Sequence, residues 1–345
     1  MDPSRYVPAY LEQAYIDEHD ELTPAARELL HDEIARHPET YATSDHARAL
    51  LSYARTHAHL HAELIRMEGL SDEEFDRKRA RLFDETRMEL MRIWQGDRLC
   101  VDARLLDILL ANVPLDDCLV DLIHLEREVR DELVHALGGF DPDVPGFWIS
   151  SSGSPLPQEE SALKTATNPV VIGWLHIVEA LAQGSIASGR YRAGASYARI
   201  VMRSEGYPNL AVGTLLLALA RLEDEDAFFA CIREADPDLH LDDSPWYLLA
   251  RTILLYKLGR RKNARRALRD FAARCDGGAF FLLNPTYLTP YLPVRPAVSE
   301  PWELTHQAIW EADGIIADTP DFVLWAEGVE GVMESSEHFA DRNGF

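Results

Sequence analysis

Closely spaced cysteines are missing from this sequence. No CxxC pair occurs, so a thiolate zinc site is not indicated. We expect the four cysteines, which lie far apart, to be small core residues or free thiols in a reducing compartment: Cys100, Cys118, Cys231 and Cys275.

Basic residues are scarce as well. The chain contains 34 lysines and arginines but 58 aspartates and glutamates, which gives a formal net charge of −24. Because nucleic-acid binding depends on neutralising phosphates, we predict no nucleic-acid partner for this acidic protein. The densest basic run lies on one predicted helix and contains Arg260, Arg261, Lys262, Arg265, Arg266 and Arg269. We expect it to be a solvated helix face that meets acidic neighbours.

Segments for secretion or membrane insertion are not visible. The N-terminal sequence Met-Asp-Pro-Ser-Arg-Tyr shows no basic segment followed by an apolar one. The longest apolar stretch, Leu210–Ala220, is too short to span a bilayer. These absences predict a cytoplasmic protein with no membrane partner.

Signatures of catalysis are missing too. The sequence contains neither the GxxxxGK[ST] phosphate loop nor GxGxxG. The serine-rich segment 150–154 lies in a region rich in proline and glycine and not at a strand-to-helix elbow, so it does not indicate a nucleophile. We predict no enzymatic activity and no cofactor. Since no segment reads as a strong β-strand, we predict an all-α fold.

What the sequence does contain is a helical repeat. Residues 169–275 read as three helical hairpins, of which Ser244–Cys275 is the clearest. The helix breaks are 33 and 37 residues apart, at Gly189, Leu222 and Gly259. A period near 34 residues is typical of a helix-turn-helix solenoid, so we predict a tetratricopeptide-like (TPR-like) α-solenoid over 159–275. The alternative is an ordinary helical bundle with chance spacing.

The N-terminal residues 1–138 are predicted to be helical, with at least one helical hairpin broken near Pro114. Ser71, followed three residues later by Glu74, indicates a capping box at a helix start. Whether these helices continue the solenoid of the repeats is left open.

Two further segments complete the predicted organisation. Residues 139–158 are rich in proline, serine and glycine and are predicted to be a linker or long loop. Residues 276–345 are predicted to form a loop rich in aromatic residues and proline, followed by C-terminal capping helices. We expect the chain after Glu334 to fray.

Short motifs within Gly146–Ala326 point to a family. They are Gly146-Phe147-Trp148, Gly189 with Tyr191, Pro208-Asn209 with Gly213, Ser244-x-Trp246 with Gly259, Asn284-Pro285 with Tyr291-Leu292, and Thr319-Pro320 with Trp325. On these residues the sequence resembles the TPR-type bacterial proteins similar to the suppression-of-tumorigenicity-seven family. The resemblance implies a binding scaffold without established catalytic residues.

Two histidine patterns could carry chemistry. His57 and His61 lie one helical turn apart, as metal ligands on a helix do, although surface histidines on helices are common. His124 and Glu128 have the same spacing, which suits a proton-transfer pair but also an ordinary exposed ion-pair helix. We predict no metal site and regard both helices as structural.

The leading hypothesis is a non-catalytic scaffold that binds a protein or peptide partner through a concave face lined by the first helix of each hairpin. The alternatives are a metal-binding protein or enzyme that uses His57 and His61, and a self-associating structural subunit, that is, a homo-oligomer. The residues predicted to line the face are His176, Glu179, Gln183, Asn209, Trp246, Tyr256 and Lys257. An equally considered alternative is that Trp246 and Tyr256 only fill the junction between repeats.

Overall fold

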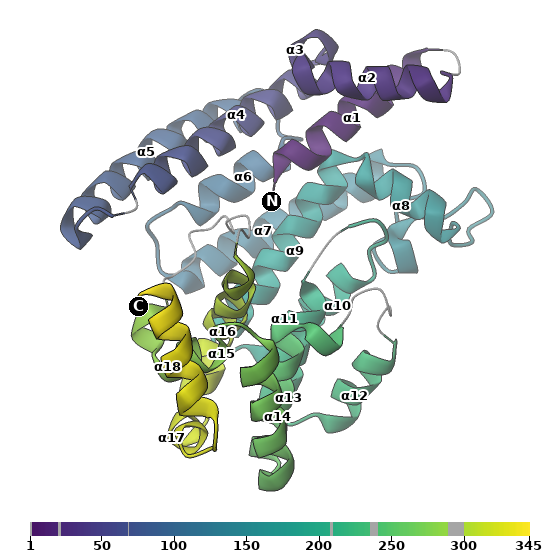
Figure 1. Ribbon diagram of the computed structural model, residues 1–345. Helices are drawn as coiled ribbons and strands as arrows, with labels where there is room; N and C mark the ends of the chain where they lie inside the picture. Colours follow the sequence, from purple (N-terminus) through teal and green to yellow (C-terminus); the bar gives the residue numbers. More distant parts are fainter. Residues whose placement is uncertain (1, 20–21, 68, 208–209, 235–240, 289–299) are drawn as a thin grey trace. The chain divides into compact units, whose positions relative to one another are not determined.

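The computed structural model describes residues 2–19, 22–67, 69–207, 210–234, 241–288 and 300–345 (Figure 1). Within these ranges every regular element is a helix, and β structure is limited to two isolated bridges, Phe140 with Trp148 and Ile149 with Pro155. The predicted all-α fold class is therefore confirmed.

The chain divides into two compact units. Unit 1 comprises Met1–Val178 and Arg203–Pro208, and unit 2 comprises Glu179–Met202 and Asn209–Phe345. The division falls inside one helix, α9 (Pro169–Ala187), and not in the segment 139–158. Proline and glycine mark a chain reversal in the sequence, but they do not reveal which residues share a core.

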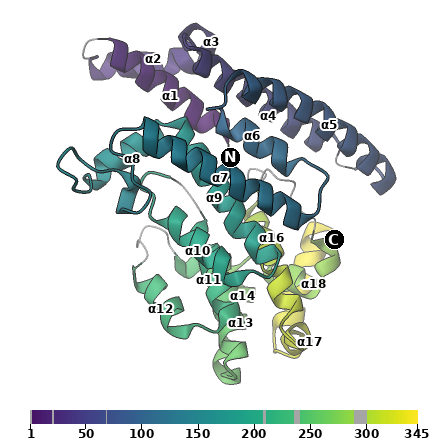
Figure 2. The same cartoon turned by 180° about the vertical axis from the view of Figure 1, so that it is seen from behind.

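The helices of unit 1 pack largely in chain order. Helix α1 contacts α2 and α4, α4 runs alongside α5, α5 contacts α6, and α6 contacts α7 (Figures 1 and 2). Besides the first part of α9, the helices are α1 (Pro3–Glu18), α2 (Pro24–Arg36), α3 (Pro38–Tyr41), α4 (Asp45–Arg66), α5 (Asp72–Gly96), α6 (Val101–Leu109), α7 (Leu115–Ala136) and α8 (Gln158–Ala166).

Local sequence signals explain where several of these helices begin. The Ser44 side chain caps α4 by accepting a hydrogen bond of 3.0 Å from the backbone N–H of Ala47. Pro114 precedes α7, so the predicted α6–α7 hairpin breaks at the expected proline. Helix α5 begins directly after Ser71, as predicted, but the Ser71 side chain makes no capping hydrogen bond.

The segment 139–158 is a packed loop of unit 1. Phe140 and Trp148 form an antiparallel bridge and are both buried, and the Phe147 ring lies edge-on to Trp174 of α9. The Trp148 indole N–H donates to the Thr165 hydroxyl at 3.1 Å. Of the two forms predicted for this segment, the structure shows the loop.

Unit 2 contains the rest of α9 and the helices that follow it. They are α10 (Tyr191–Met202), α11 (Ala211–Leu222), α12 (Glu225–Glu234), α13 (Pro245–Lys257), α14 (Arg261–Arg274), α15 (Gly278–Leu283), α16 (Pro301–Ala317), α17 (Phe322–Glu327) and α18 (Val332–Asn343). Helix α11 packs on α10, α12 and α13, and α13 packs on α14 (Figure 1).

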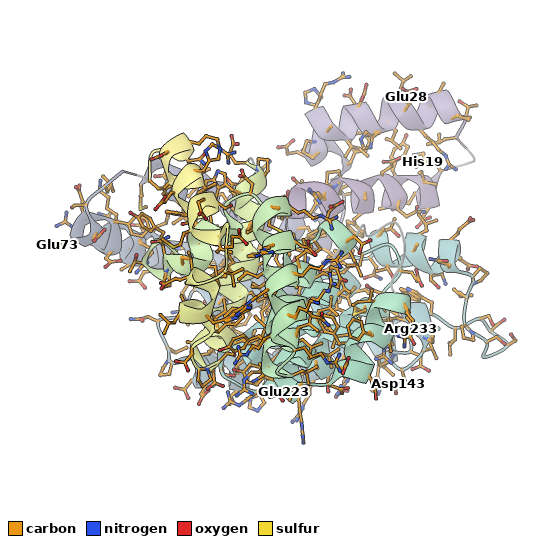
Figure 3. All side chains as sticks on the ribbon, turned by 60° about the horizontal axis from the view of Figure 1, so that its bottom comes forward. His19, Glu28, Glu73, Asp143, Glu223 and Arg233 are labelled. Carbon is orange, nitrogen blue, oxygen red and sulfur yellow. The ribbon has the colours of Figure 1, made fainter. Side chains whose placement is uncertain are left out.

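Each predicted hairpin break is a turn in the structure. Gly189 and Gly259 take left-handed backbone conformations with φ of 75° and 71°, which glycine adopts without strain. At the middle break Leu222 is the last residue of α11, and Glu223, which is labelled in Figure 3, takes the left-handed conformation with φ of 60°. The predicted break at Leu222 is therefore one residue early.

The C-terminal residues do not fray. Helix α18 continues to Asn343, and Phe339 packs its ring against Phe281 and Phe345 at centroid distances of 5.5 and 5.6 Å. The expectation of fraying after Glu334 is wrong because an aromatic cluster anchors α18 to α15.

Helix α9 is the one helix, in the part of the chain that the structure describes, that is long and apolar enough to cross a membrane by length and composition. From the sequence we considered the uninterrupted apolar run Leu210–Ala220 and overlooked α9, in which His176, Glu179 and Gln183 interrupt the apolar residues. In the fold 67% of its most apolar window is buried, as expected of a core helix surrounded by protein.

Candidate functional site

The residues predicted to line a binding face occupy different environments. Lys257 is half-buried, and its ammonium group lies 3.2 Å from the carboxylate of Glu223. His176, Trp246 and Tyr256 are buried, Glu179 and Gln183 are half-buried, and Asn209 lies outside the described residues.

Helix α16 covers the helices that were expected to form the face. It packs against both α11 and α13, the first helices of the second and third hairpins. Glu311 of α16 is buried and accepts hydrogen bonds from the Thr214 hydroxyl of α11 and, at 2.7 Å, from the indole N–H of Trp246 on α13. The chain itself thus occupies this part of the expected binding face.

Tyr256 is held by the same C-terminal region. Its hydroxyl donates to the carbonyl oxygen of Pro320 at 2.9 Å, and its ring lies edge-on to Phe322 with centroids 5.1 Å apart. The Arg261 guanidinium lies over the face of the Tyr256 ring, 3.7 Å from its centroid. Burial of Trp246 and Tyr256 favours the alternative interpretation that both fill a junction.

A glycine makes the contact between α11 and α13 close. A Cβ atom at Gly213 would lie 2.5 Å from Cγ of Trp246, a separation that no side chain tolerates. Trp246 is only 2% exposed, so it is packed inside the protein and does not extend into solvent. Gly213, which is part of one of the family motifs, is a packing residue inside α11.

His176 belongs to a buried polar cluster of unit 1. Its Nδ1 lies 2.8 Å from the Asp102 carboxylate, which also accepts a hydrogen bond of 2.6 Å from the Tyr6 hydroxyl. Burial works to raise the pKa of Asp102, but the charge and hydrogen bond of His176 and the hydrogen bond from Tyr6 outweigh it, so the net pKa lies below its ordinary value. The cluster ties α1, α6 and α9 together. No sequence motif reveals this cluster, because its three residues are distant in the chain.

The basic run on α14 meets acidic neighbours only in part. Arg260 pairs with Glu225, Arg274 pairs with Asp243, and Arg269 lies 2.9 Å from Glu330. Lys262, Arg265 and Arg266 are exposed, and no ion pair involves them in the described part of the chain. With Arg269 they follow the spacing i, i+3, i+4, i+7 and lie on one face of the helix. We call Lys262, Arg265, Arg266 and Arg269 the basic stripe.

The second histidine pattern is an ion-pair network. Glu128 binds the guanidinium groups of Arg98 at 2.8 Å and Arg104 at 2.6 Å. The hydrogen bond from Arg104 lowers the pKa of the Glu128 carboxyl below its ordinary value. A carboxylate held in this way is a poor proton acceptor for His124, which is exposed on the same helix.

The other histidine pair, His57 and His61 on α4, is more unusual. Their ring centroids lie 4.7 Å apart, and the Nε2 atom of each ring is buried without a hydrogen-bond partner in the described part of the structure. The buried hydroxyl of Tyr53, one turn before His57, also has no partner there. Burial, with a further contribution from His61, lowers the pKa of His57 to about 4, so this ring is neutral at pH 7. An unsatisfied buried polar group costs about 1–3 kcal/mol, so three together call for an explanation.

None of the described residues supplies a complete protein ligand set for a metal. Among them, no group of three or more histidine, cysteine, aspartate and glutamate side chains lies within reach of one ion. All four cysteines are free thiols, and burial raises the pKa of Cys275 to about 12. Such thiols are unreactive packing groups.

Comparison of the chain with protein-family models, with curated protein sequences and with solved structures gives no match. The family resemblance of the short motifs therefore stays a prediction.

Proposed function

We propose that this protein is a non-catalytic helical scaffold that binds an acidic segment of a protein partner through the basic stripe on α14. The observation that carries the proposal is the set of exposed cations Lys262, Arg265 and Arg266, which have no ion-pair partner among the described residues, in a chain with a net charge of −24. In so acidic a protein most surface cations have carboxylates to pair with, so a row of cations without such partners in the described part of the chain is a specific feature.

The TPR-like arrangement belongs to the same proposal. Consecutive contacts of α10 with α11, α11 with α13, and α13 with α14 support it, because stacked helical hairpins contact their neighbours in this order. Since α16 covers α11 and α13, we place the partner on α14, the second helix of the third hairpin. A cytoplasmic location and the resemblance to the family named above remain expectations.

The size of the stripe favours an acidic peptide over a nucleic acid. From Lys262 to Arg269 the stripe spans about 10 Å along the helix, which matches one or two turns of a peptide. Charges of the rest of the protein are screened beyond about 8 Å at physiological ionic strength, so a short acidic segment meets mainly the local cations. A polyanion that extends past the stripe meets the acidic surface instead.

The expected binding is weak and sensitive to salt. Each exposed ion pair contributes about 0.2–1 kcal/mol, so the stripe supplies only part of the binding free energy. Neighbouring contacts must add the rest. We therefore expect a transient interaction that weakens as ionic strength rises.

The test measures fluorescence anisotropy of a labelled Glu/Asp-rich peptide titrated with the full chain at low and at high salt. The variant carries Lys262→Ala, Arg265→Ala and Arg266→Ala. Its control carries Arg36→Ala, Arg66→Ala and Arg92→Ala, which remove three exposed arginines already paired within unit 1. Both variants change the net charge from −24 to −27.

If the stripe binds the peptide, the α14 variant loses affinity several-fold more than the control, and a Gln/Asn counterpart of the peptide does not bind. Equal losses in the two variants would mean that only overall charge matters. No loss in either would remove the stripe as the binding site.

A further inference from the structure

The strongest unexplained feature lies on one face of α4. Tyr53, His57 and His61 follow one another at intervals of four residues, so their side chains lie in a row on the helix. The ring centroids are 5.9 Å apart between Tyr53 and His57 and 4.7 Å apart between His57 and His61. Tyr53 and His57 are 0% and 6% exposed, and His61 is half-buried.

Each of these three side chains carries a polar atom that requires a hydrogen-bond partner or a bound ion. The Tyr53 hydroxyl and the Nε2 atoms of both imidazoles are buried, and none of the described residues offers them a hydrogen bond. Buried polar groups in folded proteins are almost always satisfied by protein, by ordered water or by an ion.

We propose that His57 and His61 chelate a divalent transition metal ion of the zinc type through their Nε2 atoms. Two imidazoles one helical turn apart can reach one ion, and neutral imidazole is a preferred ligand of Zn²⁺, Ni²⁺ and Cu²⁺. This inference does not depend on the proposed peptide binding.

The surroundings decide what kind of metal site this is. Helix α1 packs on α4, and the Asp2 carboxylate at its N-terminal end interacts electrostatically with both histidines. Asp2 already caps α1 by accepting from the Ser4 backbone N–H at 3.0 Å. With two protein ligands, the remaining coordination positions are taken by water, which makes the ion exchangeable. We expect affinity in the micromolar range, below that of closed four-ligand sites.

The chain contains a matched control for this proposal. His59 lies on the same helix between the two ligands, but it is exposed and on another face of α4. His59→Gln therefore removes an imidazole from the same helix without touching the site. His57→Gln and His61→Gln each remove one ligand and leave a polar side chain of similar length.

The experiment titrates the full chain, first stripped of metal with a chelator, with Zn²⁺ against a chromogenic competitor at pH 7. The proposal predicts one bound equivalent, unchanged affinity in His59→Gln, and at least a tenfold loss in His57→Gln and in His61→Gln. Mg²⁺ at the same concentration does not compete, because it prefers oxygen ligands. Absence of Zn²⁺ binding, or an equal loss in all three variants, overturns the proposal.

A measurement on the unmodified protein covers the case in which a variant does not fold. In chain labelled with ¹⁵N-histidine, Zn²⁺ binding shifts the Nε2 resonances of two imidazoles together. If no pair of Nε2 resonances moves when Zn²⁺ is added, the partner of these atoms is water and the metal site is refuted.

Discussion

The indole N–H of Trp246 on α13 donates a hydrogen bond of 2.7 Å to the buried carboxylate of Glu311 on α16. The same carboxylate accepts from the Thr214 hydroxyl on α11. One side chain of α16 therefore satisfies polar groups on two helices of the repeat region. This arrangement explains why α16, and not an external partner, lies against α11 and α13.

Replacement of Glu311 tests how much this contact stabilises unit 2. Glu311→Leu leaves the Thr214 hydroxyl and the Trp246 indole N–H without this acceptor, so we expect the free energy of unfolding to fall by about 2–4 kcal/mol. Urea denaturation followed by circular dichroism measures the change. Asp313→Asn on the exposed side of α16 is the control and should change stability by less than about 0.5 kcal/mol. A Glu311→Leu protein as stable as the control would show that the carboxylate contributes nothing.

The hairpin pattern was predictable from the sequence, whereas the packing of α16 against α11 and α13 was not. The apolar periodicity of a helix and the turn preference of glycine are local signals that a few neighbouring residues carry. The structure has turns at both glycines, Gly189 and Gly259. The contact of Glu311 with Trp246 joins residues 65 positions apart. No local sequence rule distinguishes an aromatic side chain that binds another protein from one that packs against a later helix of the same chain. Trp246 and Tyr256 were accordingly open to both interpretations.

The close approach of α11 and α13 yields a second prediction. Gly213→Ala would place a Cβ atom 2.5 Å from Cγ of Trp246, so we expect a loss of about 1–3 kcal/mol from overpacking. Gly314→Ala on α16 is the matched control, because a Cβ there meets nothing within 4 Å. It should stabilise the helix by about 0.5–1 kcal/mol. Thermal unfolding shows whether Gly213→Ala lowers and Gly314→Ala raises the stability. A destabilised Gly314→Ala would contradict the explanation.

The turn after α13 tests backbone conformation alone. Gly259 has φ of 71°, and a Cβ at this position meets no atom within 4 Å. Gly259→Val should therefore lose about 1 kcal/mol or more through strain and not through a clash. Gly259→Asn should lose less, since asparagine tolerates the left-handed conformation. Equal melting temperatures for the wild type and the valine variant would argue against this role of Gly259.

The residues of both candidate sites could be found in the sequence, but their burial and their partners could not. The spacing of His57 and His61 was visible, but their burial and their unsatisfied Nε2 atoms arise from packing against other helices. The basic run on α14 was also visible. Its expected acidic neighbours exist for Arg260 and Arg269, whereas Arg265 has none in the described residues. Which charges find partners depends on distances between helices, and these are a property of the tertiary structure.

The buried carboxylate of Asp102 predicts a specific dependence of stability on pH. Its pKa lies below the ordinary value of 3.8 in the folded protein. The unfolded chain therefore binds the proton more readily than the folded chain does. The resulting stabilisation is fully present above about pH 4 and is lost as the pH falls through the folded pKa. Tyr6 and His176, which contact the carboxylate, keep it charged.

Asp102→Asn removes the charge and keeps the shape of the side chain. We expect it to lower the free energy of unfolding by about 1.5–3 kcal/mol at pH 7, since it weakens two hydrogen bonds to a charged group. As the pH falls from 4 towards 2, the wild type should lose this advantage and the two stabilities should converge. The measurement is urea unfolding of both proteins at a series of pH values. Asp84→Asn, an exposed change on α5, provides the control and should follow the wild type throughout. A difference between wild type and Asp102→Asn that stays constant down to pH 2 would show that the pKa of Asp102 is the same in the folded and the unfolded chain.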